Sequence, residues 1–515
     1  MNAASMRGAS TSRGSTAVAR CAAVLALATG LAFPAAPARA ASDVLNVDLV
    51  NEPATLDPHM QANHDSFAVY RNIFDNLVAR DDDGRIVPQI ATGWRFVSDT
   101  EIEFDIREGV VFHDGSPLTA DDVVYSVRRI IDPALRSPQL SNFNRIVAAD
   151  PAGPGKVRLR TGTAYPVLLA QLVNLSIVPR AVIERVGQEA FLLNPVGSGP
   201  YRFVSWQRGA RVVLAANSAY WGDRPTFPRV EFNAVPDAAT RIANLRTGRS
   251  DLAVTLNPDH VAELRADGRA QPVIVLSERV AVLRINTLTG PLADIRLRRA
   301  VWHAIDRELI VRTLLGGNDR VVPIFGSPAS FGWIEGIEGP RYDPALAKRL
   351  VQEAGAAAQQ ELVFNTAPVF DQRVVQAIQQ MLGEAGLRAR IAMFDTAAYM
   401  RRATGNPEEA GDLAMERWTC TCADVEGILE PLFRSTSTWA RYKNPEMDRA
   451  LDAGRSTLNP EERLRAYRQV YELIARDVAT VPLYQQAVVY GTARQLVWRP
   501  TPQEGMFVNR MRWRN

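Results

Sequence analysis

Apolar and polar residues alternate in two segments of the first part of the chain, and this alternation predicts β-strands. Residues 44–50 show it first. In residues 101–106, three acidic residues alternate with two isoleucines and a phenylalanine, so we expect one buried face and one solvated face. Two turns, at residues 107–109 and 113–115, should fold the apolar residues 110–112 between them into a hairpin.

A helix is predicted directly after this hairpin. Thr119 and Asp122 have the spacing of a capping pair, in which a hydroxyl and a carboxylate satisfy free backbone amides at a helix start. Valines and isoleucines then recur on one helix face as far as Ile131, and Pro133 ends the helix. Apolar periodicity and capping residues predict further helices at 67–77, 237–245, 294–305, 306–315, 341–354, 372–384 and 459–478.

The remaining apolar segments predict strands at 201–206, 212–216, 230–235 and 280–286. Residues 51–65 contain Pro53 and Pro58 and should form a loop. A tight turn at 195–201 contains a Gly-x-Gly, but Arg202 stands where a dinucleotide-binding motif has its third glycine, so the turn is interpreted as structural. Strands and helices in this mixed order indicate an α/β fold.

Residues 1–40 have the pattern of an export signal. Three arginines precede a short run of Ala, Leu and Val, and Ala38-Arg39-Ala40 has small residues where a signal peptidase requires them. The run is shorter than the roughly 20 residues needed to span a bilayer. We therefore expect export, cleavage and release, with a mature start at Ala41.

Removal of this segment changes the net charge of the chain. Four arginines and no acidic residue leave with it, so 55 basic and 56 acidic residues remain, a net charge of about −1. A near-neutral chain gives no electrostatic case for a nucleic acid or an anionic membrane as partner. About 475 residues also exceed what one hydrophobic core supports, so two or three sub-domains are expected.

Five motifs occur in an order that is typical of one protein family. They are EPATLDP, LVARDDDGRIVPQIATGW, FHDGSPLTADDV, NPVGSGPYRF and LRINTLTGPLADIRLRRAVWHAIDRELI. With them the chain resembles the periplasmic solute-binding proteins for dipeptides, oligopeptides and nickel, which form extracellular solute-binding protein family 5 of ABC importers. Several motifs in the right order are far more specific than any one motif, and the resemblance covers nearly the whole mature chain.

The resemblance implies a type II-like periplasmic-binding-protein fold, in which two α/β lobes enclose a ligand cleft. Lobe I would comprise residues 41–280 and 486–515, with an extra sub-domain at about 93–195, and lobe II would comprise residues 281–485. The implied protein is a periplasmic, monomeric receptor and not an enzyme, without a cofactor or a resident metal. It would close around a peptide-like or small polar solute and deliver it to an ABC permease in the inner membrane.

The resemblance also implies where the ligand is held. In the dipeptide and oligopeptide binders, a Trp followed three residues later by an Asp lines the cleft, and that Asp pairs with the α-ammonium of the ligand. Trp418 matches the Trp, but Thr421 stands at the Asp position. Because a buried ammonium needs a counter-charge, ordinary dipeptides should bind poorly unless Asp424 or Glu416 replaces the missing carboxylate.

Three further residues are candidate ligand contacts. The resemblance places Asn286, at the end of a strand, and Arg373, at the start of a helix, where the family often contacts its ligand, and an arginine can clamp a carboxylate. A solvated surface role for Arg373 is the alternative. His59 shares a loop with His64 and could meet a ligand, but none of the five histidines has metal-ligand spacing, and no serine lies in a nucleophile elbow.

Cys420 and Cys422 are the only cysteines after residue 40. In an oxidising compartment such a pair can stay as buried, inert thiols, form a reactive or disulfide-bonded pair, or hold a soft metal, although no further ligand completes a tetrahedral set. We count both among the candidate ligand contacts. The competing function is a secreted hydrolase or a thiol-dependent enzyme that uses Cys420 and Cys422.

Overall fold

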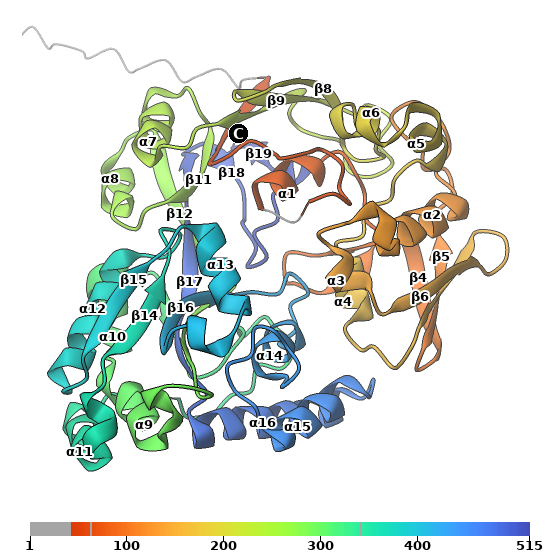
Figure 1. Ribbon diagram of the computed structural model, residues 1–515. Coiled ribbons are helices and arrows are strands. Elements are labelled where there is room, and N and C mark those ends of the chain that lie inside the picture. The colour runs from red at the N-terminus through yellow and green to blue at the C-terminus, as the bar shows by residue number, and fades with distance from the viewer. Residues whose placement is uncertain (1–42, 62–63, 340, 515) are drawn as a thin grey trace, which may run out of the picture. The chain divides into compact units, whose positions relative to one another are not determined.

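The computed structural model describes residues 43–61, 64–339 and 341–514. The expected export signal at 1–40 and the expected mature start at Ala41 lie outside the described residues. The described chain is a mixed α/β structure, as the order of the sequence segments predicts (Figure 1).

An eleven-stranded sheet runs through the described chain in the order β15-β14-β16-β12-β17-β11-β1-β10-β9-β8, with β13 beside β17. Its strands are β1 (Val44–Leu49), β8 (Tyr201–Gln207), β9 (Arg211–Ala216), β10 (Arg229–Ala234), β11 (Leu252–Leu256), β12 (Ala270–Ile285), β13 (Arg320–Val321), β14 (Leu362–Thr366), β15 (Ala389–Met393), β16 (Leu413–Trp418) and β17 (Thr480–Ala493). The strands predicted at 44–50, 201–206, 212–216, 230–235 and 280–286 are confirmed.

Strands β12 and β17 connect the two sides of this sheet. They pair antiparallel from Ala270 opposite Ala493 to Arg284 opposite Thr480, and the register shifts between Leu276 and Val280. We call the strands from β11 to β8 the β1 side and the strands β15, β14 and β16 the β16 side. The sequence pattern predicted only the last third of β12, because the first part lacks a clear alternation.

The β1 side carries its own hydrophobic core. Strand β1 pairs in parallel with both β10 and β11, and its buried side chains pack with those of the neighbouring strands. Helices α7 (Ala238–Thr247) and α8 (His260–Ala266) lie along this side (Figure 1). Both ends of α7 are capped, since Asp237 accepts a hydrogen bond from the Thr240 amide and Gly248 is left-handed.

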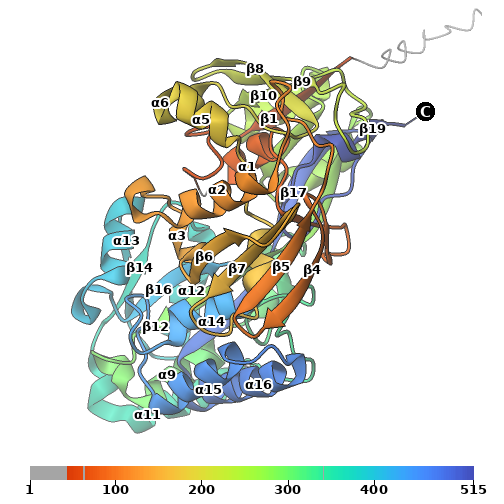
Figure 2. The same cartoon turned by 90° about the vertical axis from the view of Figure 1, so that its right-hand side faces the viewer.

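A second sheet has four strands in the order β4-β5-β7-β6. These strands lie between β1 and β8 in the sequence. Its members are β4 (Ala91–Ser98), β5 (Glu101–Ile106), β6 (Ile146–Pro151) and β7 (Lys156–Thr161), and helix α2 (Ala120–Ile131) packs against it (Figure 2). The capping box of Thr119 and Asp122 is confirmed. The hairpin is also confirmed, since the Phe112 amide donates to Ser116 and the Leu118 amide to Val110.

One detail of the alternation in β5 was wrong. Glu103 was expected on the solvated face, but it is only 5% exposed. Arg95 on β4 lies 2.7 Å from one of its carboxylate oxygens, and Arg158 on β7 lies 3.0 Å from the other. The two neighbouring strands supply the cations that cover this carboxylate, and a single strand does not reveal them.

Helix α1 (His64–Tyr70) is shorter than the apolar periodicity to residue 77 predicts. After Tyr70 the backbone turns, and the Gly199 amide donates to the carbonyl of Ile73 at 2.8 Å. A Cβ on Gly197 would lie 2.0 Å from that same carbonyl oxygen, so the tight turn needs glycine there. The apolar residues 73, 74 and 77 are buried all the same, Ile73 and Phe74 in the core of the β1 side and Leu77 in the core of the four-stranded sheet.

The β16 side is covered by helices whose positions the sequence largely predicts. They are α9 (Ile295–Ala304), α10 (Arg307–Leu314), α11 (Pro344–Ala354), α12 (Gln372–Glu384), α13 (Thr396–Thr404), α14 (Glu426–Phe433), α15 (Pro445–Arg455) and α16 (Pro460–Asp477). The expected N-caps Asp294, Asp306 and Asn459 each accept hydrogen bonds from the amides that follow. Two cores lie here, one under α9 to α12 and one under α14 to α16.

The smaller elements complete the described chain: β2 (Val78–Arg80), β3 (Ile86–Pro88), α3 (Leu140–Phe143), α4 (Leu168–Leu172), α5 (Arg180–Val186), α6 (Gln188–Leu193), β18 (Leu496–Val497) and β19 (Arg512–Trp513). Short 3₁₀ turns lie between several of them. In the part of the chain that the structure describes, no helix is both long and apolar enough to span a bilayer.

Candidate functional site

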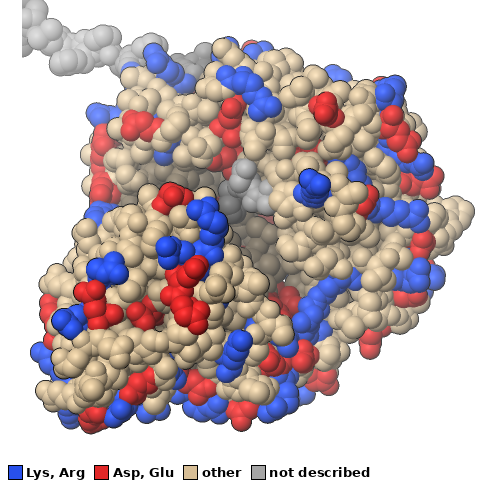
Figure 3. Space-filling model, viewed as in Figure 1, with Lys and Arg blue, Asp and Glu red and all other residues tan. Residues whose placement is uncertain are grey.

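A cavity of about 800 Å³ lies between the chain around the four-stranded sheet and the chain that follows β16. The first wall is formed by Phe67, Gln139, Ser141, Asn142, Asn144, Arg145, Tyr165, Gln171 and Asn174, and the second by Thr419, Cys420, Thr421, Glu426, Gly427, Glu430, Pro431, Trp439 and Arg455. The face in Figure 3 is hollowed near its centre, and basic and acidic side chains are interspersed over it. The volume is in the range of small-molecule sites.

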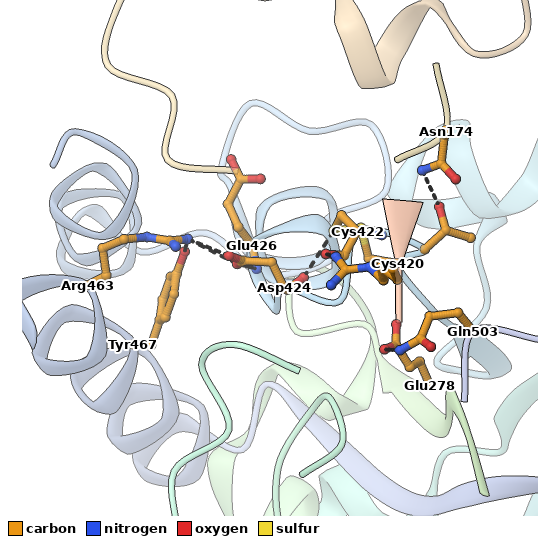
Figure 4. Close-up of a disulfide and its surroundings, with 11 residues drawn as sticks. Asn174, Glu278, Cys420, Cys422, Asp424, Glu426, Arg463, Tyr467 and Gln503 are labelled. Carbon is orange, nitrogen blue, oxygen red and sulfur yellow. Dashed lines mark hydrogen bonds and ion pairs between the residues drawn. A yellow bond between two sulfur atoms is a disulfide. The ribbon is translucent and has the colours of Figure 1, made fainter. Parts of the chain in front are cut away.

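The loop between β16 and α14 contacts both walls (Figure 4). Asn174 Nδ2 donates a hydrogen bond of 3.1 Å to Thr421 Oγ1, and the amide oxygen of Asn174 accepts one from Arg71. Arg80, on β2, donates to the carbonyl oxygen of Cys422. Through this loop, the second wall of the cavity is therefore hydrogen-bonded directly to the first.

Cys420 and Cys422 form a disulfide. Of the three states that the sequence left open, the structure has the bonded pair. Cys422 is completely buried and belongs to the hydrophobic core of the four-stranded sheet, while Cys420 lines the cavity. A Cβ on Gly427 would lie 2.4 Å from Cys420 Sγ, so the first turn of α14 needs a glycine to pack against the sulfur. Among the described residues, no group of three or more His, Cys, Asp or Glu could hold a metal ion.

Asp424 and Glu416, the two candidate replacements for the missing carboxylate, both have arginine partners. Asp424 accepts two hydrogen bonds from Arg463 Nη2, at 3.0 and 2.9 Å. Glu416 lies 3.0 Å from Arg284 and accepts a 2.8 Å hydrogen bond from Trp418 Nε1. Neither carboxylate lines the 800 Å³ cavity.

Trp418 acts on the cavity through a second tryptophan. Its ring packs edge to face against Trp439, with 5.1 Å between ring centroids, and Trp439 lines the cavity. Trp439, backed by Trp418, thus forms an apolar end of the cavity wall, and the orientation of Trp418 is fixed by its hydrogen bond to Glu416.

Glu426 is the acidic side chain of the cavity that has no close partner. Among the described residues, its nearest basic group is Arg145, whose Nη2 lies 3.6 Å from Oε1, longer than a hydrogen bond. Burial raises the pKa of Glu426 to about 7, against the opposing charge of Arg145. Arg145 packs over the ring of Tyr165, with its guanidinium 4.9 Å from the ring centroid.

His59 lies in a buried network beneath helix α2 and does not line the cavity. Its Nε2 lies 2.9 Å from the carbonyl oxygen of Ser176, and its Nδ1 lies 2.9 Å from Arg129 Nη1. Because the guanidinium can only donate, Nδ1 accepts and the imidazole is neutral with its proton on Nε2. Burial and the charge of Arg129 lower the pKa of His59 to about 4.

Asn286 and Arg373 are also outside the 800 Å³ cavity. Asn286 lines a separate cavity of about 510 Å³ and donates to the backbone carbonyls of Pro407 and Gly411. Arg373 is 45% exposed and lies 2.7 Å from Asp371 and 3.2 Å from Asp259. The structure therefore brings together Trp418, Cys420, Thr421 and the buried Cys422 and Asp424, but not His59, Asn286 or Arg373.

Sequence reasoning missed Arg145, Asn174 and Glu426. Arg145 and Asn174 follow short helices, with no motif around them. Glu426 lies two residues after Asp424, and its N-terminal position in α14 gives a weak signal, since acidic residues favour a helix start. No local pattern in the sequence places Arg145 opposite Glu426.

Residues 85–439 match the family model described as bacterial extracellular solute-binding proteins, family 5 Middle. The chain is 27% identical over 492 residues to the glutathione-binding protein GsiB of Salmonella paratyphi A. This alignment covers 92% of this chain and 94% of that protein. In the described part of the chain, the two-lobed fold of solved periplasmic binding proteins is also present. The ABC transporter substrate binding protein CtaP from Listeria monocytogenes has a TM-score of 0.84 and 21% identity, and it covers 92% of this chain and 100% of that chain. The periplasmic binding protein DppA from Helicobacter pylori, in complex with the peptide STSA, has a TM-score of 0.78 and 23% identity, and it covers 92% of this chain and 98% of that chain.

Proposed function

Since this chain belongs to family 5 of the bacterial extracellular solute-binding proteins, we propose that it binds a small peptide-like or polar solute in the 800 Å³ cavity. Proteins of this family are transport receptors of ABC importers and not enzymes, so the hydrolase and thiol-enzyme hypotheses are not supported. The single observation that carries the choice of cavity is that its two walls come from different parts of the fold.

The ligand class follows from the chemistry of the walls. The hydroxyls of Thr419 and Thr421 and the carboxamides of Asn142, Gln171 and Asn174 offer both donors and acceptors, and Trp439, backed by Trp418, supplies one apolar end. Such a mixture suits a short polar molecule with several amide groups. GsiB is named as a glutathione-binding protein and DppA was solved with a peptide, which supports the same class for this chain.

We place lobe I at residues 41–280 and 486–515, with a sub-domain at about 93–195, and lobe II at residues 281–485. The support is the course of β12 and β17, whose register shifts at residues 276–280, next to the proposed boundary. The cavity then lies between lobe I and lobe II. Ligand contacts to both lobes would favour the closed form, which the permease recognises.

Within the cavity we propose Cys420 and Thr421 as direct ligand contacts, with Trp418 acting by orienting Trp439. Cys422 and Asp424 hold the loop that carries these residues, through the disulfide and the ion pair with Arg463. His59, Asn286 and Arg373, the other candidate contacts from the sequence, do not line this cavity, and we do not place them among the contacts to a solute bound there.

The finer points of location and assembly are part of the same proposal. Family 5 binding proteins are periplasmic. We propose that this chain is exported to the periplasm and that its signal is cleaved off after residue 40. It would act there as a monomer and deliver its solute to an inner-membrane permease. Size-exclusion chromatography with light scattering and amino-terminal sequencing of the exported protein would test both points.

A thermal-shift screen of residues 41–515 tests the proposed ligand class. The panel contains glutathione, short peptides, opine-like amino-acid conjugates and metal chelates. A true ligand at a hundredfold its dissociation constant should add about 2.7 kcal/mol to the free energy of unfolding. If every class leaves the midpoint unmoved, the proposed ligand class is wrong. Mass spectrometry of a ligand that co-purifies with the exported protein provides an independent identification.

A further inference from the structure

The acidic groups near the cavity differ in whether their charge is already neutralised. Glu430 Oε1 lies 2.7 Å from Arg434 and 3.2 Å from Arg455, and Asp424 is paired with Arg463. Glu426 instead has only Arg145 at 3.6 Å, although its side chain is mostly buried. A largely buried carboxylate with so distant a partner lacks most of the compensation that burial of a charge requires.

Arg145, on the opposite wall, also lacks close hydrogen-bond partners among the described residues. Its Nη1 is buried and has no hydrogen-bond partner among the described residues, and its Nη2 reaches only the distant Glu426 oxygen. The packing of the guanidinium over Tyr165 holds it at the cavity. Unused guanidinium donors of this kind suit a carboxylate, which can accept two parallel hydrogen bonds.

We propose that Arg145 and Glu426 together bind a zwitterionic head group of the solute, with its ammonium on Glu426 and its carboxylate on Arg145. The inference rests on the proposed function, because it places the transported solute in this cavity. The head group is an α-amino-acid end, in which both charges sit on one carbon. Lying alongside the pair, with each of its charges facing the side chain of opposite sign, it adds to each side chain a close charge-assisted hydrogen bond that the 3.6 Å pair lacks.

This arrangement also gives the closed form a specific cause. Arg145 lies between α3 and β6, and Glu426 begins α14, so each lobe contributes one of the two charges. A solute with only one of the charges would leave the other residue uncompensated in a partly buried cavity. Binding therefore selects solutes that carry a free amine and a free carboxylate on the same carbon.

Protonation supports the assignment. Burial raises the pKa of Glu426 to about 7, Arg145 and Arg463 oppose this rise, and the negative charges of Asp424 and Glu430 add to it. Tyr165 is the other titratable group at this end of the cavity, and burial and the charge of Glu426 raise its pKa far above neutrality. A bound ammonium favours ionised Glu426, so affinity should rise from pH 6 to pH 7.5.

Titration calorimetry with glutathione and N-acetylglutathione tests the proposal. The γ-glutamyl end of glutathione carries the required head group, and acetylation removes its positive charge. The unaltered protein should bind glutathione at least 100-fold more tightly than the acetylated form. Glu426→Gln should reduce this ratio to less than 5-fold and abolish the pH dependence, while Glu361→Gln, on an exposed strand-flanking residue, should leave both unchanged.

Three results would overturn the proposal or its premise. If Glu426→Gln keeps the 100-fold discrimination, the head group is bound elsewhere, although the receptor function stands. If glutathione and every other member of the screening panel fail to bind, the proposed ligand class falls and this inference with it. Arg145→Gln provides a second readout that does not depend on the stability of α14, since it should weaken glutathione binding at least 10-fold without removing the pH dependence. An unchanged affinity would contradict the assignment.

Discussion

Arg463 Nη2 lies 3.0 and 2.9 Å from the two carboxylate oxygens of Asp424, and both side chains are buried, at 5% and 4% exposure. Arg463 also donates to Tyr467 and lies over the ring of Phe331. The charge of Asp424 is therefore used within the β16 side, to hold the loop before α14 against α16. It is not available to a ligand ammonium at the cavity.

Removal of one partner of this pair should destabilise the protein strongly. Asp424→Asn leaves the Arg463 charge buried without compensation, and we expect the free energy of unfolding to fall by about 3–5 kcal/mol. Denaturant unfolding monitored by tryptophan fluorescence measures the change. Arg476→Ala, which breaks exposed ion pairs on the same helix, is the control and should cost less than about 1 kcal/mol. Equal losses in the two variants would show that burial of the Asp424 pair is not decisive.

The disulfide predicts the thiol content of the exported protein. Cys420 and Cys422 are the only cysteines after residue 40 and are bonded to each other. A thiol-reactive dye should detect no thiol in residues 41–515, either native or in denaturant, and two thiols after reduction. Two reactive thiols in denaturant before reduction would contradict the bonded pair.

Loss of the disulfide should affect binding more than stability. The bond closes a loop of very few residues, so the chain-entropy effect of Cys420→Ala/Cys422→Ala is only about 1–2 kcal/mol. The loop also carries Thr421, which accepts a hydrogen bond from Asn174 across the cavity. We expect a solute that binds the unaltered protein to bind this variant at least 10-fold more weakly in titration calorimetry. Unchanged affinity with lowered stability would mean that the loop position does not depend on the bond.

The position of Thr421 should exclude simple dipeptides. Thr421 contributes a hydroxyl where the resemblance expects a carboxylate, and dipeptides carry their two charges at opposite ends, which does not suit a single α-amino-acid site. L-alanyl-L-alanine should therefore bind poorly, and Thr421→Asp should improve its affinity by about 10-fold, the effect of roughly 1.4 kcal/mol. Thr421→Asn is the control, because asparagine has the size of aspartate but no charge. Tight binding of this dipeptide by the unaltered protein would refute the prediction.

His59 should make stability depend on pH in the acid range. Burial and Arg129 lower its pKa to about 4, whereas an unfolded histidine titrates near 6.5. The unfolded chain then binds the extra proton first, so the stabilisation is fully present above about pH 6.5 and is lost as the pH falls toward 4. Between pH 7 and 4.5 the unaltered protein should lose about 2–3 kcal/mol more than His59→Gln. Parallel stability curves for the two proteins would show that His59 is not held neutral.

Much of the fold follows from interactions between residues that are close in the sequence. The capping box joins Thr119 and Asp122, which are three positions apart, and the N-caps Asp294, Asp306 and Asn459 bond to amides two or three positions away. Such contacts form wherever the segment lies, so the pattern predicts them correctly. The two-lobed fold was expected from the resemblance of several motifs, in their order, to one family.

The site was less accessible to sequence reasoning, because its contacts join residues far apart along the chain. Trp418 could be selected because it matches a family motif, and Thr421 because it departs from that motif. Cys420 could be selected because it is one of only two cysteines after residue 40. Arg145 could not be selected, because its partner Glu426 is more than 280 positions away in the sequence and no nearby residue marks it. His59 was selected for its chemistry, but the structure buries it against Arg129.

By itself the sequence determined many of the elements and several of their caps, since short-range hydrogen bonds and apolar periodicity depend on neighbouring residues. Its motifs also indicated the α/β fold of a solute-binding family. Only the tertiary structure decided where helix α1 ends, why Glu103 is buried and which carboxylate remains for a ligand. Each of these outcomes depends on a charge or a backbone group that is supplied by a distant segment. Asp424 and Glu426 are two positions apart, and packing against Arg463 alone makes one a structural anion and leaves the other facing the cavity.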